Sequence, residues 1–213
     1  MFRWQRGRFL HRGLAPVHLE RVGRFIAALH EQAGRFTPPD GFERWQIGDL
    51  SDDVRGVVAE EVGSLAGAQA SVIVDEVAER VMKARRELGT GPDVYGLIHA
   101  DLHQENYFFA GEQVRAIDFD DCGWGHHLHD LAVTLSEIRG RERYEELRAA
   151  LLRGYRSVRW LPPDHERYLE TFRALRTIQM TLWVIERRED PSFAGWQLDV
   201  REGLADLEAF LRG

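Results

Sequence analysis

Polar side chains that could bind a metal ion are concentrated between short apolar runs in residues 97–131. Asp101 and Asn106 flank one loop, and Asp118 closes an apolar run a short distance further on. If the apolar runs on either side of this turn pair as a hairpin, Asp118 folds back beside Asn106. Two oxygen ligands then lie together, with a further carboxylate one loop away.

Phosphoryl transfer requires a set of this kind. Magnesium prefers hard oxygen ligands in octahedral geometry and neutralises phosphate oxygens. A separate carboxylate orients the attacking hydroxyl and accepts its proton. The residue types and their spacing therefore favour a phosphotransferase that uses magnesium.

Two motifs in this segment resemble the protein-kinase-like superfamily. Residues 99–106 read HADLHQEN, which resembles the catalytic loop H-R-D-L-x-x-x-N, and residues 117–120 read IDFD, which resembles the D-F-G segment. A histidine at position 103, where protein kinases usually carry lysine, is similar to aminoglycoside phosphotransferases and choline kinases. The chain is thus identified as similar to the aminoglycoside phosphotransferase family, of which it resembles the C-terminal lobe.

The resemblance implies a role for each polar residue of the two motifs. Asp101 would be the catalytic base, with His103 near the γ-phosphate or the acceptor substrate. Asn106 and Asp118 would hold magnesium and, through it, ATP. Asp120 replaces the glycine of D-F-G, so we expect no flipping of this segment as a switch.

Further residues would support the site or bind the acceptor. The resemblance implies that His99 braces the catalytic loop from within, and that Asp130 braces it from the following helix. The family places its acceptor pocket among late helices, where this chain has the candidate pocket residues Trp183, Glu186 and Asp190. A packed helix pair with a solvated edge explains these three residues equally well.

The elements that must position these residues are mostly helical. Apolar residues at spacings of three and four predict helices over residues 16–34, 70–88, 130–138, 141–158, 164–186 and 193–211. Short apolar runs predict strands over residues 95–98, 106–109 and 114–119, with the last two joined as a hairpin. Residues 49–67 are acidic and only partly periodic, so they receive no assignment. We predict a mainly α (α+β) fold, a kinase-like C-terminal lobe with a small β-hairpin carrying the catalytic and metal-binding loops.

The β-rich lobe that grips ATP in complete kinases has no counterpart in this pattern. The first 90 residues contain no glycine-rich loop between strands, and the only lysine, Lys83, falls in a predicted helix. We expect residues 1–12 to be a hinge-like entry segment, residues 13–213 the helical catalytic lobe, and the nucleotide-clamping lobe to be absent. The chain alone would then be incomplete or weakly active, and a homodimer or a partner could supply the missing lobe.

Composition limits the classes of binding partner that we expect for this chain. A net charge of -7 gives no reason to expect nucleic acid or an anionic membrane. It fits a cationic small-molecule alcohol, and surface solubility explains it equally well. No apolar run approaches the roughly 20 residues of a membrane helix. Cys122 is the only cysteine, so no disulfide forms within the chain, and a cytoplasmic location follows by default.

Two other functions stay open. The chain could be a kinase-like binding module that keeps the site without catalysing. It could also be a metal-dependent phosphohydrolase in which His99, Asp101, His103 and Asp118 ligate a metal that activates water.

The acceptor is likewise open among aminoglycosides, choline-like amines, homoserine and protein Ser or Thr side chains. A zinc site at His126, His127 and His129 is disfavoured, because no cysteine pair accompanies them.

Overall fold

The computed structural model describes residues 6–10, 12–50 and 60–213. It divides into two compact units, the first made of Met1–Ile47 and Thr90–Glu166 and the second of Gly48–Gly89 and Arg167–Gly213. The expected boundary between an entry segment and a single helical lobe near residue 12 stays a prediction. Part of that entry segment, residues 1–5 and 11, lies outside the described residues.

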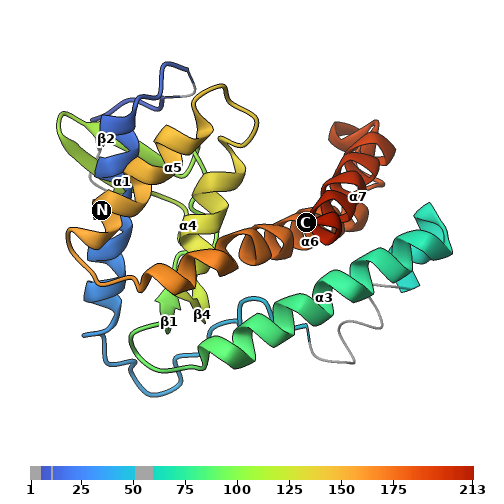
Figure 1. The fold of residues 1–213 in the computed structure, drawn as a ribbon, viewed down its shortest axis with the longest axis horizontal. Coiled ribbons are helices and arrows are strands. Elements are labelled where there is room, and N and C mark those ends of the chain that lie inside the picture. The colour runs from blue at the N-terminus through green and yellow to red at the C-terminus, as the bar shows by residue number, and fades with distance from the viewer. Residues whose placement is uncertain (1–5, 11, 51–59) are drawn as a thin grey trace. The chain divides into compact units, whose positions relative to one another are not determined.

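Two long helices form the frame of the first unit. Helix α1 (Pro16–Ala33) begins with a proline, whose fixed φ suits a first helical turn, and α5 is Tyr144–Arg156. The two helices run side by side (Figure 1). They approach very closely, because a Cβ at Gly23 would overlap the Leu151 carbonyl and one at Gly154 would overlap the Glu20 carbonyl.

Two small antiparallel sheets in the first unit set the position of the predicted catalytic residues. Strand β1 (Tyr95–Ile98) pairs with β4 (Gly123–His126), and β2 (Tyr107–Ala110) pairs with β3 (Gln113–Ala116). Residues 99–106 connect β1 to β2, and residues 117–122 connect β3 to β4. Because Ile98 pairs with Gly123 and Tyr107 with Ala116, both loops start and finish at paired positions. The register therefore makes the two loops run beside each other in opposite directions.

A short helix follows the second sheet pairing. Helix α4 (His127–Ser136) begins directly after β4 and is buried along nearly its whole length. Its residues Leu128, Leu131 and Leu135 lie in the core of the first unit. Asp130 lies in the first turn of α4. Its position is fixed by strand β4, which directly precedes the helix, and by the packing of α4 itself in the core.

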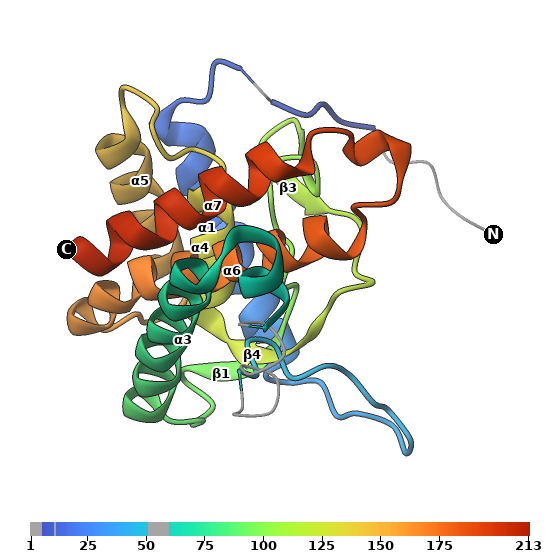
Figure 2. The same ribbon diagram turned by 90° about the vertical axis from the view of Figure 1, so that its right-hand side faces the viewer.

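The second unit consists of helices. Its main elements are α3 (Ala68–Leu88), α6 (Leu169–Glu186) and α7 (Trp196–Arg212), which pack on one another (Figure 2). The 3-10 turn Pro191–Phe193 precedes α7, and the 3-10 turn Pro163–Tyr168, which begins in the first unit, precedes α6. Residues 60–66 are also helical. The buried face of this unit is aliphatic and includes Val77, Val81, Leu175, Ile178 and Leu207.

The predicted mainly α fold with a small β part is confirmed. The sequence pattern did not predict strand β4, and it predicted β3 to continue to residue 119. Asp118 ends the ladder early because its φ of 61° is left-handed. Of the unassigned stretch, residues 51–59 lie outside the described residues. No helix in the described parts of the chain has both the length and the apolar character that a membrane crossing requires.

The close approach of α1 and α5 gives a first testable prediction. Gly23→Ala places a methyl group against the Leu151 carbonyl, so we expect the free energy of unfolding to fall by about 1–3 kcal/mol, as for overpacking. Gly34→Ala is the matched control, because Gly34 is right-handed at φ -63° and its nearest neighbour is 3.5 Å away. Urea unfolding measures both. Equal stability of the two variants would contradict the close helix contact.

Candidate active site

The two loops between the sheets are joined by hydrogen bonds. The His99 ring Nε2 lies 3.0 Å from the carbonyl oxygen of Ile117, and the Ile117 amide donates to the Asn106 carbonyl at 3.0 Å. Each bond connects residues 99–106 with residues 117–122, so the loops are held together at both ends of the first loop. The predicted juxtaposition of Asn106 with the Asp118 segment is present, since Asp118 directly follows Ile117.

Asp101 is held by two side chains of its own loop. The Asn106 amide nitrogen donates to the Asp101 backbone carbonyl and to its carboxylate Oδ2, both at 2.9 Å. His103 Nε2 lies 3.4 Å from the same Oδ2. The Asp101 and His103 side chains are only 18% and 22% exposed. A carboxylate oriented in this way can accept a further hydrogen bond from an incoming hydroxyl.

Asn106 is oriented as a metal ligand would have to be. Both acceptors on Asp101 attract the NH₂ group, so the amide oxygen of Asn106 is turned away from them. The Asp118 carboxylate stands in the neighbouring loop on an exposed, left-handed residue. Magnesium is usually held by one or two protein oxygens together with nucleotide phosphates. Asn106 and Asp118 fit that requirement.

Asp130 braces the start of the catalytic loop. Its fully buried carboxylate accepts hydrogen bonds from the backbone N–H groups of His99 at 3.1 Å and Ala100 at 2.8 Å. Ala100 has a φ of 69°, a conformation that costs a residue with a Cβ roughly 1–2 kcal/mol. The two bonds to Asp130 offset this cost, as expected for strain kept at a functional site.

Two residues that the sequence reasoning missed complete the brace. His30, on α1, lies with Nε2 3.0 Å from Asp130 Oδ2 and with Nδ1 2.9 Å from the Tyr155 hydroxyl of α5. Burial raises the pKa of the Asp130 carboxyl, but the hydrogen bond to His30 and the charge of His30 together lower it by more. The net pKa of Asp130 therefore lies below its usual value. The one available signal was a histidine four residues after Ile26, on the apolar face of α1.

The other histidines have structural partners in the first unit. Because a carbonyl accepts from it, His99 Nε2 must carry the hydrogen, and a protonated nitrogen cannot ligate a metal. His126 packs edge-on against the Tyr95 ring, and His127 Nδ1 lies 3.2 Å from the Asp93 carbonyl. Within residues 6–10, 12–50 and 60–213, no three His, Cys, Asp or Glu side chains form a metal-holding group.

The candidate pocket residues Trp183, Glu186 and Asp190 belong to the second unit. Trp183 packs edge-on against Phe193, and the Arg187 guanidinium lies 4.5 Å from the centre of the Trp183 ring. Hydrogen bonds from the Ser192 backbone and hydroxyl, both accepted by the Asp190 carboxylate, hold the pKa of Asp190 below its usual value. The Glu186 side chain is 71% exposed.

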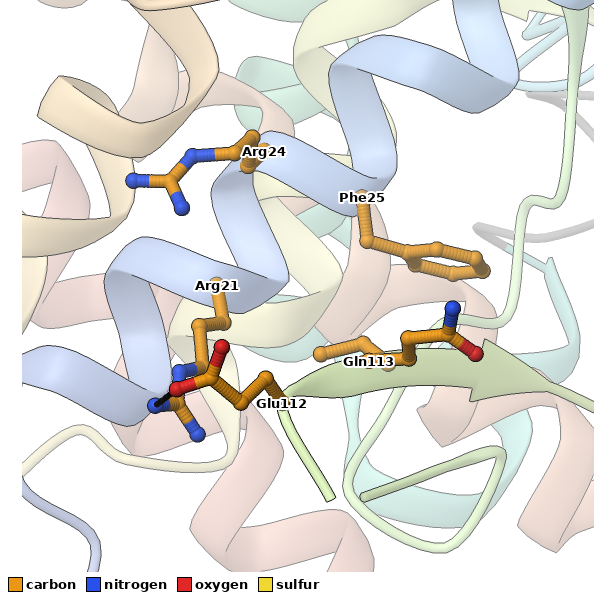
Figure 3. Close-up of a pocket in the computed structure, with 6 residues that line it drawn as sticks. Arg21, Arg24, Phe25, Glu112 and Gln113 are labelled. Carbon is orange, nitrogen blue, oxygen red and sulfur yellow. Dashed lines mark hydrogen bonds and ion pairs between the residues drawn. The ribbon is translucent and has the colours of Figure 1, made fainter. Parts of the chain in front are cut away.

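A shallow cavity of about 260 Å³ lies at the closed end of the β2–β3 hairpin, against α1 (Figure 3). Arg21 and Glu112 form an ion pair of 3.4 Å at its edge. Its lining is Arg21, Arg24, Phe25, Glu112, Gln113 and Val114. None of these is a predicted site residue, because Asn106 and Asp118 stand at the open end of the same hairpin.

Comparison with known proteins identifies the family. Residues 2–171 match the model of the phosphotransferase enzyme family, APH, so the chain belongs to that family. It is 26% identical over 147 residues to amicoumacin kinase of Bacillus subtilis (strain 168), covering 61% of this chain and 44% of that protein. It is 33% identical over 93 residues to homoserine kinase of Neisseria meningitidis serogroup B (strain ATCC BAA-335 / MC58), covering 42% and 30%.

Solved structures agree with this assignment. A microcompartment-associated aminopropanol kinase matches with a TM-score of 0.76 and 30% identity, covering 93% of this chain and 63% of that chain. An amicoumacin kinase in complex with AMP-PNP, Ca²⁺ and Ami matches with a TM-score of 0.72 and 19% identity, again covering 93% and 63%, and shares the fold. The chain therefore spans less than half of the curated relatives named above and under two thirds of these structures.

His127 gives a prediction for acid stability. Burial, the neighbouring His30 and Arg159 lower the pKa of His127 to about 3, whereas the unfolded chain protonates it near 6.5. Between these two values the unfolded state binds more protons than the folded state. The free energy of unfolding therefore decreases as the pH is lowered, by about 1.4 kcal/mol per pH unit. From pH 7 to pH 5 this residue should account for a loss of about 2 kcal/mol.

Urea unfolding at the two pH values tests this expectation. His127→Gln should reduce the loss between pH 7 and pH 5 by about that amount, since glutamine does not titrate. His165→Gln, which replaces a partly exposed histidine, is the control and should keep the loss. An unchanged loss in His127→Gln would mean that the buried imidazole does not resist protonation.

Proposed function

We propose that this protein is an ATP-dependent phosphotransferase that moves the γ-phosphate of ATP to a hydroxyl group of a small amino alcohol. The observation that carries the proposal is the joining of the Asp101 loop to the Asp118 loop within one compact unit. That arrangement supports the proposal, because the proposed base Asp101 and the proposed metal ligands Asn106 and Asp118 lie in adjacent loops. Family membership supports the same reaction class.

In the proposed reaction the acceptor hydroxyl attacks the γ-phosphorus of ATP. A new P–O bond forms, the bond between the γ-phosphorus and the β,γ-bridging oxygen breaks, and ADP leaves with that bond's electron pair. Asp101 orients the hydroxyl and takes its proton, while Asn106 and His103 keep the carboxylate in place. His103 Nδ1 lies 3.4 Å from the Glu105 amide, so Nε2 carries the hydrogen that faces Asp101.

Asn106 and Asp118 would hold magnesium in this reaction. The ion would neutralise the phosphate oxygens and the charge that develops on the leaving group. Asp130 would act indirectly, by keeping the backbone of residues 99 and 100 in place. ATP and magnesium are proposals for this chain. They draw on the metal-competent residues and on a relative whose structure contains AMP-PNP and Ca²⁺.

The proposed acceptor class rests on charge and on the relatives. The chain carries a net charge of -7, and the matched proteins include kinases named for aminopropanol and homoserine. Trp183, Glu186 and Asp190 remain the proposed acceptor residues. Arg187 already lies on the Trp183 ring, so a cationic acceptor there would have to displace one cation from an aromatic face. The activity and partners of the whole protein are proposals as well.

Nucleotide binding is the first test of this function. The proposed metal ligands are the side-chain oxygens of Asn106 and Asp118, and the only lysine, Lys83, lies in α3 of the second unit. We therefore expect magnesium-dependent binding of AMP-PNP with a Kd in the millimolar range, about −4 kcal/mol. An NMR titration should shift the amides of residues 106 and 118, and Asp118→Ala should abolish the dependence on magnesium. Asp164→Ala, in an exposed turn, is the control. Shifts confined to other residues would place the nucleotide elsewhere.

Turnover is the second test. With MgATP and a panel of amino alcohols, ³¹P NMR should show ADP and a phosphorylated acceptor in equal amounts. Asp101→Asn keeps the shape but removes the charge, so the rate should fall about 100-fold or more. Asp164→Asn should leave it unchanged. Free phosphate as the product would favour a phosphohydrolase, and near-normal turnover of Asp101→Asn would remove Asp101 from the role of base.

A further inference from the structure

A buried hydrogen-bonded chain connects helix α5 to the catalytic loop. Tyr155 contacts His30 at 2.9 Å, His30 contacts Asp130 at 3.0 Å, and Asp130 holds the amides of residues 99 and 100. All three side chains are at most 1% exposed. The chain therefore runs from α5 through α1 and α4 to the residue before Asp101, without contact with solvent.

The proton positions in this chain follow from its chemistry. The pKa of Asp130 lies below its usual value, so the carboxylate is ionised and can only accept. His30 Nε2 must then carry a hydrogen and donate it to Asp130. Burial raises the pKa of Tyr155, which keeps its hydroxyl proton. The Tyr155 hydroxyl can donate to His30 Nδ1 or accept from it, so it keeps its contact with the ring in either case.

We propose that Tyr155 is a positioning residue for the proposed phosphoryl-transfer site, because its hydroxyl holds the His30 ring in the orientation from which Nε2 reaches Asp130. Without that hydroxyl the ring would be held at Nε2 alone and could tilt away from the carboxylate. Asp130 would then lose one of the donors that fix it, and with it the geometry that keeps Ala100 left-handed. The role in catalysis rests on the proposed function, whereas the positioning of His30 does not.

Tyr155 holds the Nδ1 side of the His30 ring, and other charged or titratable groups surround the pair. His127 stacks on the His30 ring at 4.4 Å and stays neutral near pH 7, because its pKa is about 3. The charges of Arg159 and Glu31 act on the pKa of Tyr155 in opposite directions, and these two side chains pair with each other at 2.5 Å. His99 and His129 are the other imidazoles whose charge acts on Asp130. Among these neighbours, the Tyr155 hydroxyl is the group seen in contact with Nδ1.

The test compares two buried tyrosines in the full chain. Tyr155→Phe removes the hydroxyl that contacts His30, and Tyr107→Phe removes a buried hydroxyl with no hydrogen-bond partner in the structure. ¹⁵N NMR at pH 7.5 reports the hydrogen bonding of the two His30 ring nitrogens, and hydrogen exchange reports the Ala100 amide. We expect Nε2 to carry a hydrogen in the natural protein and in Tyr107→Phe. In Tyr155→Phe we expect the Nδ1 resonance to move, because its partner is gone, and at least 10-fold faster exchange at Ala100.

A double-mutant cycle separates positioning from general loss of stability. His30→Gln removes the ring that Tyr155 holds, so adding Tyr155→Phe to it should change Ala100 exchange less than 2-fold. Amides in the core of α4 serve as the internal reference for global unfolding. A natural protein in which His30 Nε2 carries no hydrogen, or equal Ala100 exchange in Tyr155→Phe and Tyr107→Phe, would overturn the proposal. If the expected results hold while the chain transfers no phosphate, the proposed function fails and the positioning of His30 by Tyr155 stands.

Discussion

The buried carboxylate of Asp130 is the interaction on which the first unit depends. An ionised group without solvent contact is stable only if hydrogen bonds replace its hydration. Here the donors come from two places, the backbone of residues 99 and 100 and the His30 ring. If any of them moved away, a buried charge would be left without compensation. The requirement to satisfy this carboxylate thus holds the catalytic loop, α1 and α4 in one arrangement.

Sheet register explains why the two loops that carry the predicted site residues meet. Each sheet has two strands within the described part of the chain, and a pair of short strands contributes little stability alone. Their value lies in position, because Ile98 opposite Gly123 and Tyr107 opposite Ala116 set the ends of both loops. Side-chain and backbone bonds then join residues 99 and 106 to Ile117. Small sheets and a few hydrogen bonds therefore suffice to place Asp118 next to Asn106.

The sequence predicted the local parts of this site and missed the distant ones. The two motifs, the hairpin and most helices follow from spacing and apolar periodicity, which are local properties. Strand β4 reads GWGH, in which two glycines disfavour a strand, and it forms because β1 offers a pairing edge. His30 and Tyr155 lie 125 residues apart in the chain, and only tertiary packing brings them into contact. The roles of the site residues themselves stay predictions.

The close packing of α1 against α5 also sets the distance between Tyr155 and His30. Gly154 directly precedes Tyr155, and the position where its Cβ would stand is occupied by the Glu20 carbonyl of α1. Gly23 makes the reciprocal approach, one helix turn further along α1, against Leu151 and the backbone of Tyr155. Two glycines thus bring the helix backbones closer than any other residue would allow. A hydrogen bond between a tyrosine hydroxyl and an imidazole tolerates only a few tenths of an ångström. The spacing that lets Tyr155 reach His30 is therefore set by residues that carry no side chain at all.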